Sequence, residues 1–97
     1  MKGRGIMKKY EPIKLSYKQD LVLRVLADEF AGTAFGPQLL EDCENEDLKK
    51  LSINEITWAM LRLRDSELVE SEKVPYKGRI LNRYRLTPYA IYGFLEK

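Results

Sequence analysis

Apolar residues recur at helical spacing in two stretches of the chain, 16–30 and 52–65. In the first stretch they cover more than half of the helix circumference, which is typical of a central scaffold helix. In the second, Ser52 and Glu55 form an S-x-x-E capping box directly before the apolar series, so side-chain chemistry fixes where this helix begins. Its expected core face consists of Ile56, Ala59, Met60 and Leu63. The opposite face is therefore open to a partner.

An alternating pattern follows the second helix, in residues 68–74 and again in 80–86, with Pro75 and Gly78 in the turn between them. This pattern predicts a β-hairpin. In 80–86 the alternation separates apolar from largely basic side chains, so we expect the outer side of the hairpin to be mainly cationic.

Two short helices complete the prediction. Gly32 ends the first long helix, and Pro37 opens a short helix in which Leu39, Leu40 and Cys43 are expected to face the core. Residues 41–47 form an acidic connection, which we interpret as solvated because the Gly and carboxylate spacing of a calcium loop is missing. The last helix, 89–97, follows a Thr-Pro cap and is apolar on nearly every side.

This order of elements predicts an α+β fold, mostly α, of the winged helix-turn-helix type. It would have a three-helix core, a two-stranded wing and a short C-terminal helix. The 97 residues suffice for one small domain, 16–97, which is preceded by a basic N-terminal arm, 1–15.

Composition limits the chemistry of the chain. It has no His and a single Cys, which excludes disulfide frameworks, His/Cys zinc sites and His-dependent catalytic triads. We therefore expect no enzyme activity and no bound metal or cofactor. One thiol fits a reducing compartment, and no apolar run approaches the roughly 20 residues of a membrane span. No signal-peptide core follows the first residues, so we expect a cytoplasmic protein without membrane contact.

Charge is segregated along the chain although the formal net charge is only +2. Residues 1–18 carry +5 and residues 72–97 carry +4, whereas residues 19–47 carry −7 and residues 48–71 are balanced. The hairpin end is therefore basic, and the acidic middle would discourage a polyanion from approaching that edge.

The ordered set of residues resembles bacterial and archaeal winged-helix transcriptional regulators, most closely PadR-like proteins and next MarR-like ones. The matching positions are Leu51-Ser52, Ile56, Met60-x-x-Leu63, Leu68-Val69-Glu70 and Tyr84-Arg85-Leu86-Thr87, with 21–27 similar to the family's first helix and Phe35-Gly36 to the entry of its second. The resemblance covers about residues 16–90.

Three features depart from the family pattern. Glu67 replaces the Gly that usually ends the recognition helix, Thr57 stands where PadR-like proteins favour Tyr, and no long C-terminal dimerisation helix follows. The resemblance implies a homodimer on double-stranded DNA, with recognition helix 52–65 in the major groove and wing 74–80 on flanking backbone or minor groove. Only the last helix and the arm remain to form the dimer. The expected contact residues of the last helix are Tyr89, Tyr92, Phe94 and Leu95.

General geometry favours the same docking, because an α-helix fits the major groove and neighbouring Lys or Arg side chains neutralise phosphates. We expect Asn54 to pair with adenine, Thr57 to meet a thymine methyl group, and Trp58 to stack over sugars or pack against apolar groups. The expected phosphate contacts are Lys49, Lys50, Ser52, Arg62, Lys73, Lys77, Arg79 and Arg83. Of these, Lys77 or Arg79 is expected to reach a narrow minor groove.

An alternative function stays open, namely a winged-helix protein-interaction module that does not bind DNA. It is motivated by the modest net charge, the acidic connection, and the Trp58 and Leu61 pair outside the main core stripe. Arg83 and Arg85 also have a plain structural interpretation, in which they only solubilise a strand.

Overall fold

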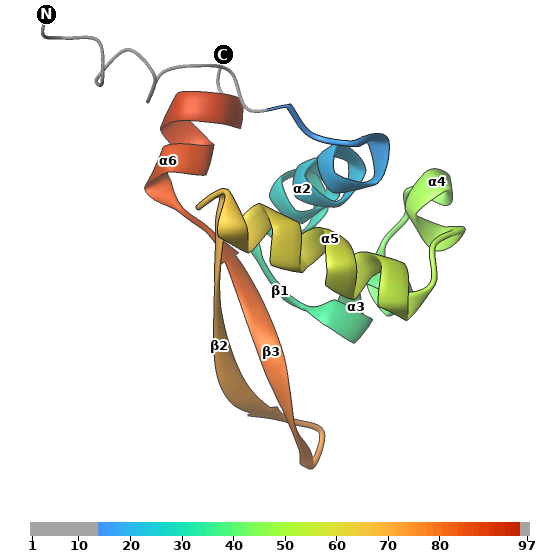
Figure 1. Cartoon of the computed structure of the whole chain (residues 1–97). Helices are drawn as coiled ribbons and strands as arrows, with labels where there is room; N and C mark the ends of the chain where they lie inside the picture. The colour runs from blue at the N-terminus through green and yellow to red at the C-terminus, as the bar shows by residue number, and fades with distance from the viewer. Residues whose placement is uncertain (1–13, 96–97) are drawn as a thin grey trace, which may run out of the picture.

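The computed structural model describes residues 14–95, so the predicted arm 1–15 lies, except for its last two residues, outside the described residues. The elements in chain order are α2 (Tyr17–Phe30), β1 (Thr33–Phe35), α3 (Gly36–Asp42), α4 (Glu46–Lys49), α5 (Ile53–Asp65), β2 (Val69–Tyr76), β3 (Arg79–Leu86), α6 (Pro88–Ala90) and the π-helical turn η1 (Ile91–Leu95). Helices α2, α3 and α5 form the body, and the β2–β3 hairpin, which we call the wing, projects from it (Figure 1). The predicted fold class is confirmed.

Both long helices begin with the capping chemistry that the sequence provides. Ser52 Oγ accepts a hydrogen bond from the Glu55 N–H at 3.1 Å, and Glu55 Oε1 accepts one from the Ser52 N–H at 2.8 Å. At the start of α2, Ser16 and Gln19 form the same reciprocal pair, with both distances 3.2 Å. The predicted starts of the two helices are therefore confirmed.

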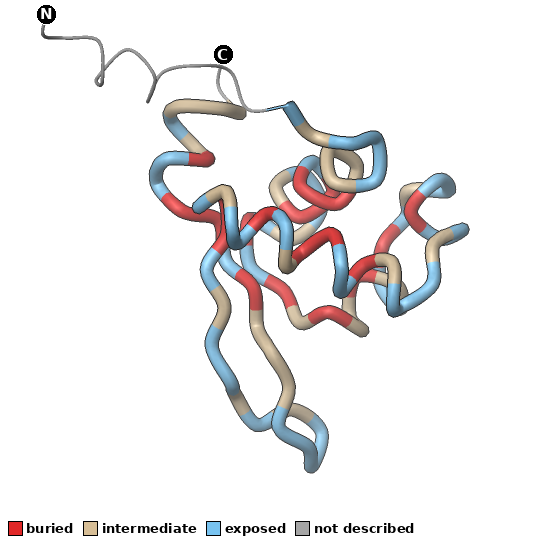
Figure 2. The backbone as a smooth tube through the Cα atoms, viewed as in Figure 1, coloured by how far each residue is buried: buried red, intermediate tan, exposed pale blue. Residues whose placement is uncertain are grey.

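The core lies between α2, α5 and the base of the sheet, while the outer part of the wing is exposed or half-buried (Figure 2). The fully buried large side chains are Val22, Leu23, Leu26, Leu39, Leu48, Ile56, Met60, Leu63, Leu68 and Val69. Each such aliphatic side chain stabilises the fold by about 1.5–3 kcal/mol relative to exposure. All four residues of the predicted core face of α5 are buried, and so is Cys43.

The sheet has three strands in the order β1-β3-β2, one more than the predicted two-stranded wing. The additional strand, β1, pairs antiparallel with β3, with Thr33 opposite Arg85 and Phe35 opposite Arg83. Three residues are too few to show a strand period in the sequence, which explains the omission. Since β1 precedes α3 directly, the sheet fixes the base of the wing to the helical body.

The turn of the hairpin is shorter than the sequence suggested. Strands β2 and β3 continue to Tyr76 and from Arg79, so only Lys77 and Gly78 remain between them. Both residues have positive φ, 53° and 79°, which is the backbone of a two-residue type I′ turn. Pro75 is tolerated inside β2 because β2 is the edge strand.

The acidic connection is only partly a loop. Its first two residues end α3 and its last two begin α4. Asn45 caps α4 by accepting a hydrogen bond from the Leu48 N–H at 2.9 Å. The interpretation of 41–47 as a connection therefore holds only for residues 43–45, because Glu41 and Asp42 end α3 and Glu46 and Asp47 begin α4. The four helical carboxylates are exposed, as a solvated segment requires. Helix α4 forms because it carries Leu48, which is fully buried, into the core.

Candidate nucleic-acid interface

One face of α5 is turned away from the core along the whole helix. The residues on this face recur at spacings of three and four, which places them in one stripe. They are Asn54, Thr57, Trp58, Leu61, Arg62 and Asp65, all exposed except the half-buried Leu61. The three predicted groove-facing residues thus share one accessible surface, and the Trp58 side chain is 64% exposed.

A shallow groove of about 360 Å³ separates this face from the start of α2 and is lined in part by Lys18, Trp58 and Arg62. Lys18 Nζ donates to Glu55 Oε2 at 2.5 Å, and this hydrogen bond, with that of the Ser52 backbone, holds the pKa of Glu55 below its usual range. Glu55 is therefore the cap partner that the sequence predicted. Sequence reasoning missed Lys18, because nothing local links residues 37 positions apart.

The outer side of the wing is not mainly cationic, and that prediction is wrong. Arg83 donates to Glu72, and Arg85 donates to Glu70 at 2.8 Å, in each case across the β2–β3 ladder. The hydrogen bond from Arg83 lowers the pKa of Glu72, and the hydrogen bond to Glu70 raises the pKa of Arg85. Because side chains alternate along β2, Glu70 and Glu72 lie on the same side of the hairpin as the two arginines and neutralise their charge.

Several other cations expected at phosphates also have carboxylate partners. Lys49 and Lys50 pair with Glu46 and Asp47 at 3.7 and 3.9 Å, and Lys77 pairs with Glu41 of α3 at 3.7 Å. Within residues 14–95, the expected phosphate contacts without a carboxylate inside 4.0 Å are Arg62, Lys73 and Arg79.

The two unpaired cations of the wing lie on opposite faces of the hairpin. Lys73 shares its face with Ser71, whose Oγ accepts a hydrogen bond from Arg64 of α5 at 3.4 Å, so this face is turned toward α5. Arg79 lies directly opposite Tyr76 in the register and shares the other face. The wing therefore presents a free cation on each side.

The residues predicted for a dimer contact divide into two groups. Tyr89 and Tyr92 are 44% and 71% exposed, whereas Phe94 and Leu95 are half-buried against the core of their own chain. The Tyr89 ring lies against the backbone of Gly93, and a Cβ added to Gly93 would be 3.1 Å from this ring. Of the four residues predicted for the contact, Tyr89 and Tyr92 are therefore the exposed ones.

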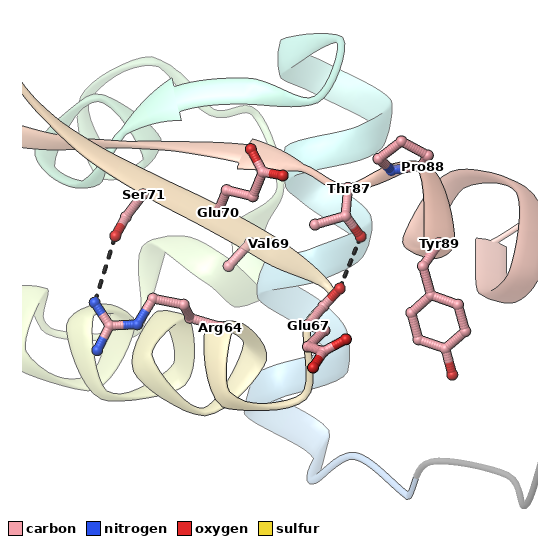
Figure 3. Close-up of a pocket in the computed structure, with 8 residues that line it drawn as sticks. All are labelled: Arg64, Glu67, Val69, Glu70, Ser71, Thr87, Pro88 and Tyr89. Atoms are coloured by element: carbon pink, nitrogen blue, oxygen red, sulfur yellow. Dashed lines mark hydrogen bonds between the residues drawn. The ribbon is translucent and has the colours of Figure 1, made fainter. Parts of the chain in front are cut away.

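A second concavity, of about 560 Å³, lies where the end of α5, the start of β2 and the start of α6 meet (Figure 3). Its lining is Arg64, Glu67, Val69, Glu70, Ser71, Thr87, Pro88 and Tyr89. Thr87 Oγ1 donates to the Glu67 carbonyl oxygen at 2.8 Å and closes one end. Glu67 has φ 64°, so the Glu found in place of the family's Gly adopts the left-handed conformation itself.

Residues 14–95 contain no group of three or more Cys, Asp or Glu side chains arranged to hold a metal ion. In the same range, none of the helices is both long and apolar enough to cross a bilayer.

The fold is that of winged-helix regulators. No family model and no curated protein matches the chain, so the relationship rests on solved structures. A point mutant of Lactococcus lactis ZitR is 24% identical with a TM-score of 0.62, and the match covers 89% of this chain and 52% of that one. The transcriptional regulator YodB of B. subtilis is 18% identical, also with a TM-score of 0.62, over 84% of this chain and 71% of its own.

Another ZitR structure, described as a zinc-responsive MarR family member, is 25% identical over 92% of this chain and 60% of that one, with a TM-score of 0.60. A ZitR mutant in complex with DNA is 25% identical over 84% and 49%, with a TM-score of 0.59. The chain spans about half the length of several of these neighbours. They support a winged-helix regulator fold and do not favour PadR-like proteins in particular.

Proposed function

We propose that this chain is a DNA-binding transcriptional regulator that acts by occupying an operator. The observation that carries the proposal is the exposed stripe of α5 beside a wing with free cations on both faces. An α-helix of this kind fits the major groove, and a hairpin beside it reaches the flanking backbone or minor groove. A ZitR mutant of this fold has been solved in complex with DNA, which supports DNA binding as the function.

Roles follow from the chemistry of each side chain. The Asn54 amide can make a bidentate pair with adenine, the Thr57 methyl can contact thymine, and Trp58 can stack over sugars. Arg62, Lys73 and Arg79 are the first-choice phosphate contacts, because none of the carboxylates described lies within 4.0 Å of them. The remaining expected contacts are Lys49, Lys50, Ser52, Lys77 and Arg83.

We further infer a homodimer, in which Tyr89 and Tyr92 form the contact and the N-terminal arm contributes. Exposed tyrosines on a terminal helix are suited to such a contact, since they bury a large area at low entropic cost. Phe94 and Leu95 would take part only at its edge. The regulator would act in the cytoplasm, and its assignment to PadR-like rather than MarR-like proteins stays a prediction from residue spacing.

A gel-shift titration of a random-sequence duplex, between about 50 and 200 mM salt, tests the proposal. We expect binding that weakens steeply with salt, and a slope that Arg79→Ala reduces by about one unit per subunit. Arg24→Ala is the matched control, because Arg24 is an exposed arginine of α2 that pairs with Asp20 and lies outside the proposed surface. No binding by the parent chain at the lowest salt, or equal slopes for Arg79→Ala and the parent, contradicts the proposal. Sedimentation of the same samples tests the dimer.

A protein-interaction module is the second candidate, and the exposure of Trp58 favours it. Trp and Arg dominate binding energy at protein interfaces, and Trp58 and Arg62 line one groove. This function predicts no duplex binding at low salt. It also predicts a stoichiometric protein partner that is lost with Trp58→Ala and kept with Arg79→Ala.

A further inference from the structure

The outer part of the wing has little support from the sheet. The last pair between β1 and β3 on the side of the wing tip is Phe35–Arg83. Between Arg83 and the turn, the wing therefore has only two strands. A two-stranded hairpin is marginally stable by itself. Its tip carries Arg79, the cation on which the proposed function depends, so a contact that holds the tip decides where this cation is presented.

Two contacts hold the tip, one at the end of β1 and the other at the last turn of α3. The rings of Tyr76 and Phe35 stack with centroids 4.2 Å apart and planes inclined by 26°. Next to the stack, Lys77 Nζ lies 3.7 Å from Glu41 Oε1 and 5.2 Å from the Tyr76 ring centroid. Tyr76 is half-buried although its neighbours Pro75 and Lys77 are exposed. The tip is thus docked at one aromatic contact with a charged contact beside it.

We propose that Tyr76 is a positioning residue for DNA binding, which holds the wing tip on Phe35 and thereby fixes the location of Arg79. This inference rests on the proposed function. Tyr76 and Arg79 are cross-strand partners joined by a two-residue turn, so the backbone of one cannot move without the other. Glu41 assists by holding Lys77, the next residue of the tip, at the last turn of α3.

The test compares Tyr76→Ala with Tyr76→Phe, which keeps the ring and removes only the hydroxyl. We expect Tyr76→Ala to bind duplex DNA about tenfold more weakly, with the salt slope of the parent because no charge is lost. Amide hydrogen exchange at the wing tip, measured without DNA, should accelerate in Tyr76→Ala. Tyr76→Phe should match the parent in both measurements, and Phe35→Leu should reproduce Tyr76→Ala.

Each outcome decides the inference. Parent-like affinity and exchange in Tyr76→Ala would overturn it, and so would a Tyr76→Phe variant that loses as much as Tyr76→Ala. If the parent chain does not bind DNA, the proposed function fails and with it the positioning role in binding. The exchange measurement then still separates a docked tip from a free one, so the two failures are distinguishable.

Discussion

Replacing Ser52 with Ala is expected to destabilise the folded chain by about 1 kcal/mol, within a range of ~0.5–2 kcal/mol. The substitution removes the Oγ that accepts the hydrogen bond of the Glu55 N–H at 3.1 Å. The return bond, from the Ser52 N–H to Glu55 at 2.8 Å, uses the backbone and survives, so the loss is that of one acceptor. For a domain of this size, 1 kcal/mol lowers Tm by roughly 4–8 °C.

Thermal unfolding followed by circular dichroism measures this change. Ser16→Ala is the matched control, because Ser16 caps α2 through the same reciprocal bonds with Gln19 and should lose a similar amount. Ser52→Asp retains an acceptor and adds a favourable charge at the helix N-terminus, so its Tm should return close to that of the parent. The same variant should bind DNA less tightly if Ser52 approaches a phosphate. A parent-like Tm for Ser52→Ala would refute the capping argument.

Three further predictions concern the backbone, the thiol and pH. Gly32→Ala should cost at least about 1 kcal/mol in thermal unfolding, because φ is +89° and a Cβ would lie 3.3 Å from a leucine side chain. Gly78→Ala, with φ +79° and no described atom within 4 Å of the added Cβ, should cost less. Burial raises the pKa of the Cys43 thiol, so Ellman's reagent should label the folded chain far more slowly than the urea-unfolded chain. The lowered pKa of Glu55 contributes stability that is present above the usual pKa of a glutamate and is lost as pH falls through the folded-state pKa. Glu55→Gln should reduce this loss.

The sequence predicted those parts of the fold whose signals are local. The capping box at Ser52 is contained in one turn, and the apolar period of each long helix is contained in one continuous segment. Both signals could therefore be located without knowledge of the fold. Strand β1 and helix α4 are three and four residues long, and each exists because of a tertiary contact. Strand β1 forms by pairing with β3, and helix α4 is favoured by the burial of Leu48.

The charge of the wing could not be predicted, because it depends on strand register. A five-residue turn over 75–79 would join residues 74 and 80 and set Glu72 opposite Asn82. The two-residue turn sets Glu72 opposite Arg83 instead, and a shift of one residue changes which side chains share a face. The turn forms with Lys77 at positive φ, a position where Asn or Gly is the usual signal, so the sequence did not reveal the register.

Ion pairing also determines how binding should depend on salt. Seven cations were expected at phosphates, and the paired ones are Lys49, Lys50, Lys77 and Arg83. A paired cation that turns to a phosphate leaves a carboxylate that takes up a counterion from solution, so this exchange releases few counterions overall. We therefore expect the release that makes binding salt-dependent to come mainly from Arg62, Lys73 and Arg79, which have no carboxylate partner within residues 14–95.

The slope of log affinity against log salt, about −0.9 per phosphate, distinguishes the two cases. Three contacts per subunit give about −2.7, a loss of roughly 40-fold when salt rises fourfold, whereas seven give about −6.3 and a loss of several thousandfold. We expect the smaller value, and we expect Glu41→Gln to steepen it by about 0.9 by releasing Lys77 from its pair. A parent slope near −6 per subunit would mean that the paired cations move from their carboxylates to phosphates and that the freed carboxylates take up no counterions. This result would contradict the expected effect of ion pairing.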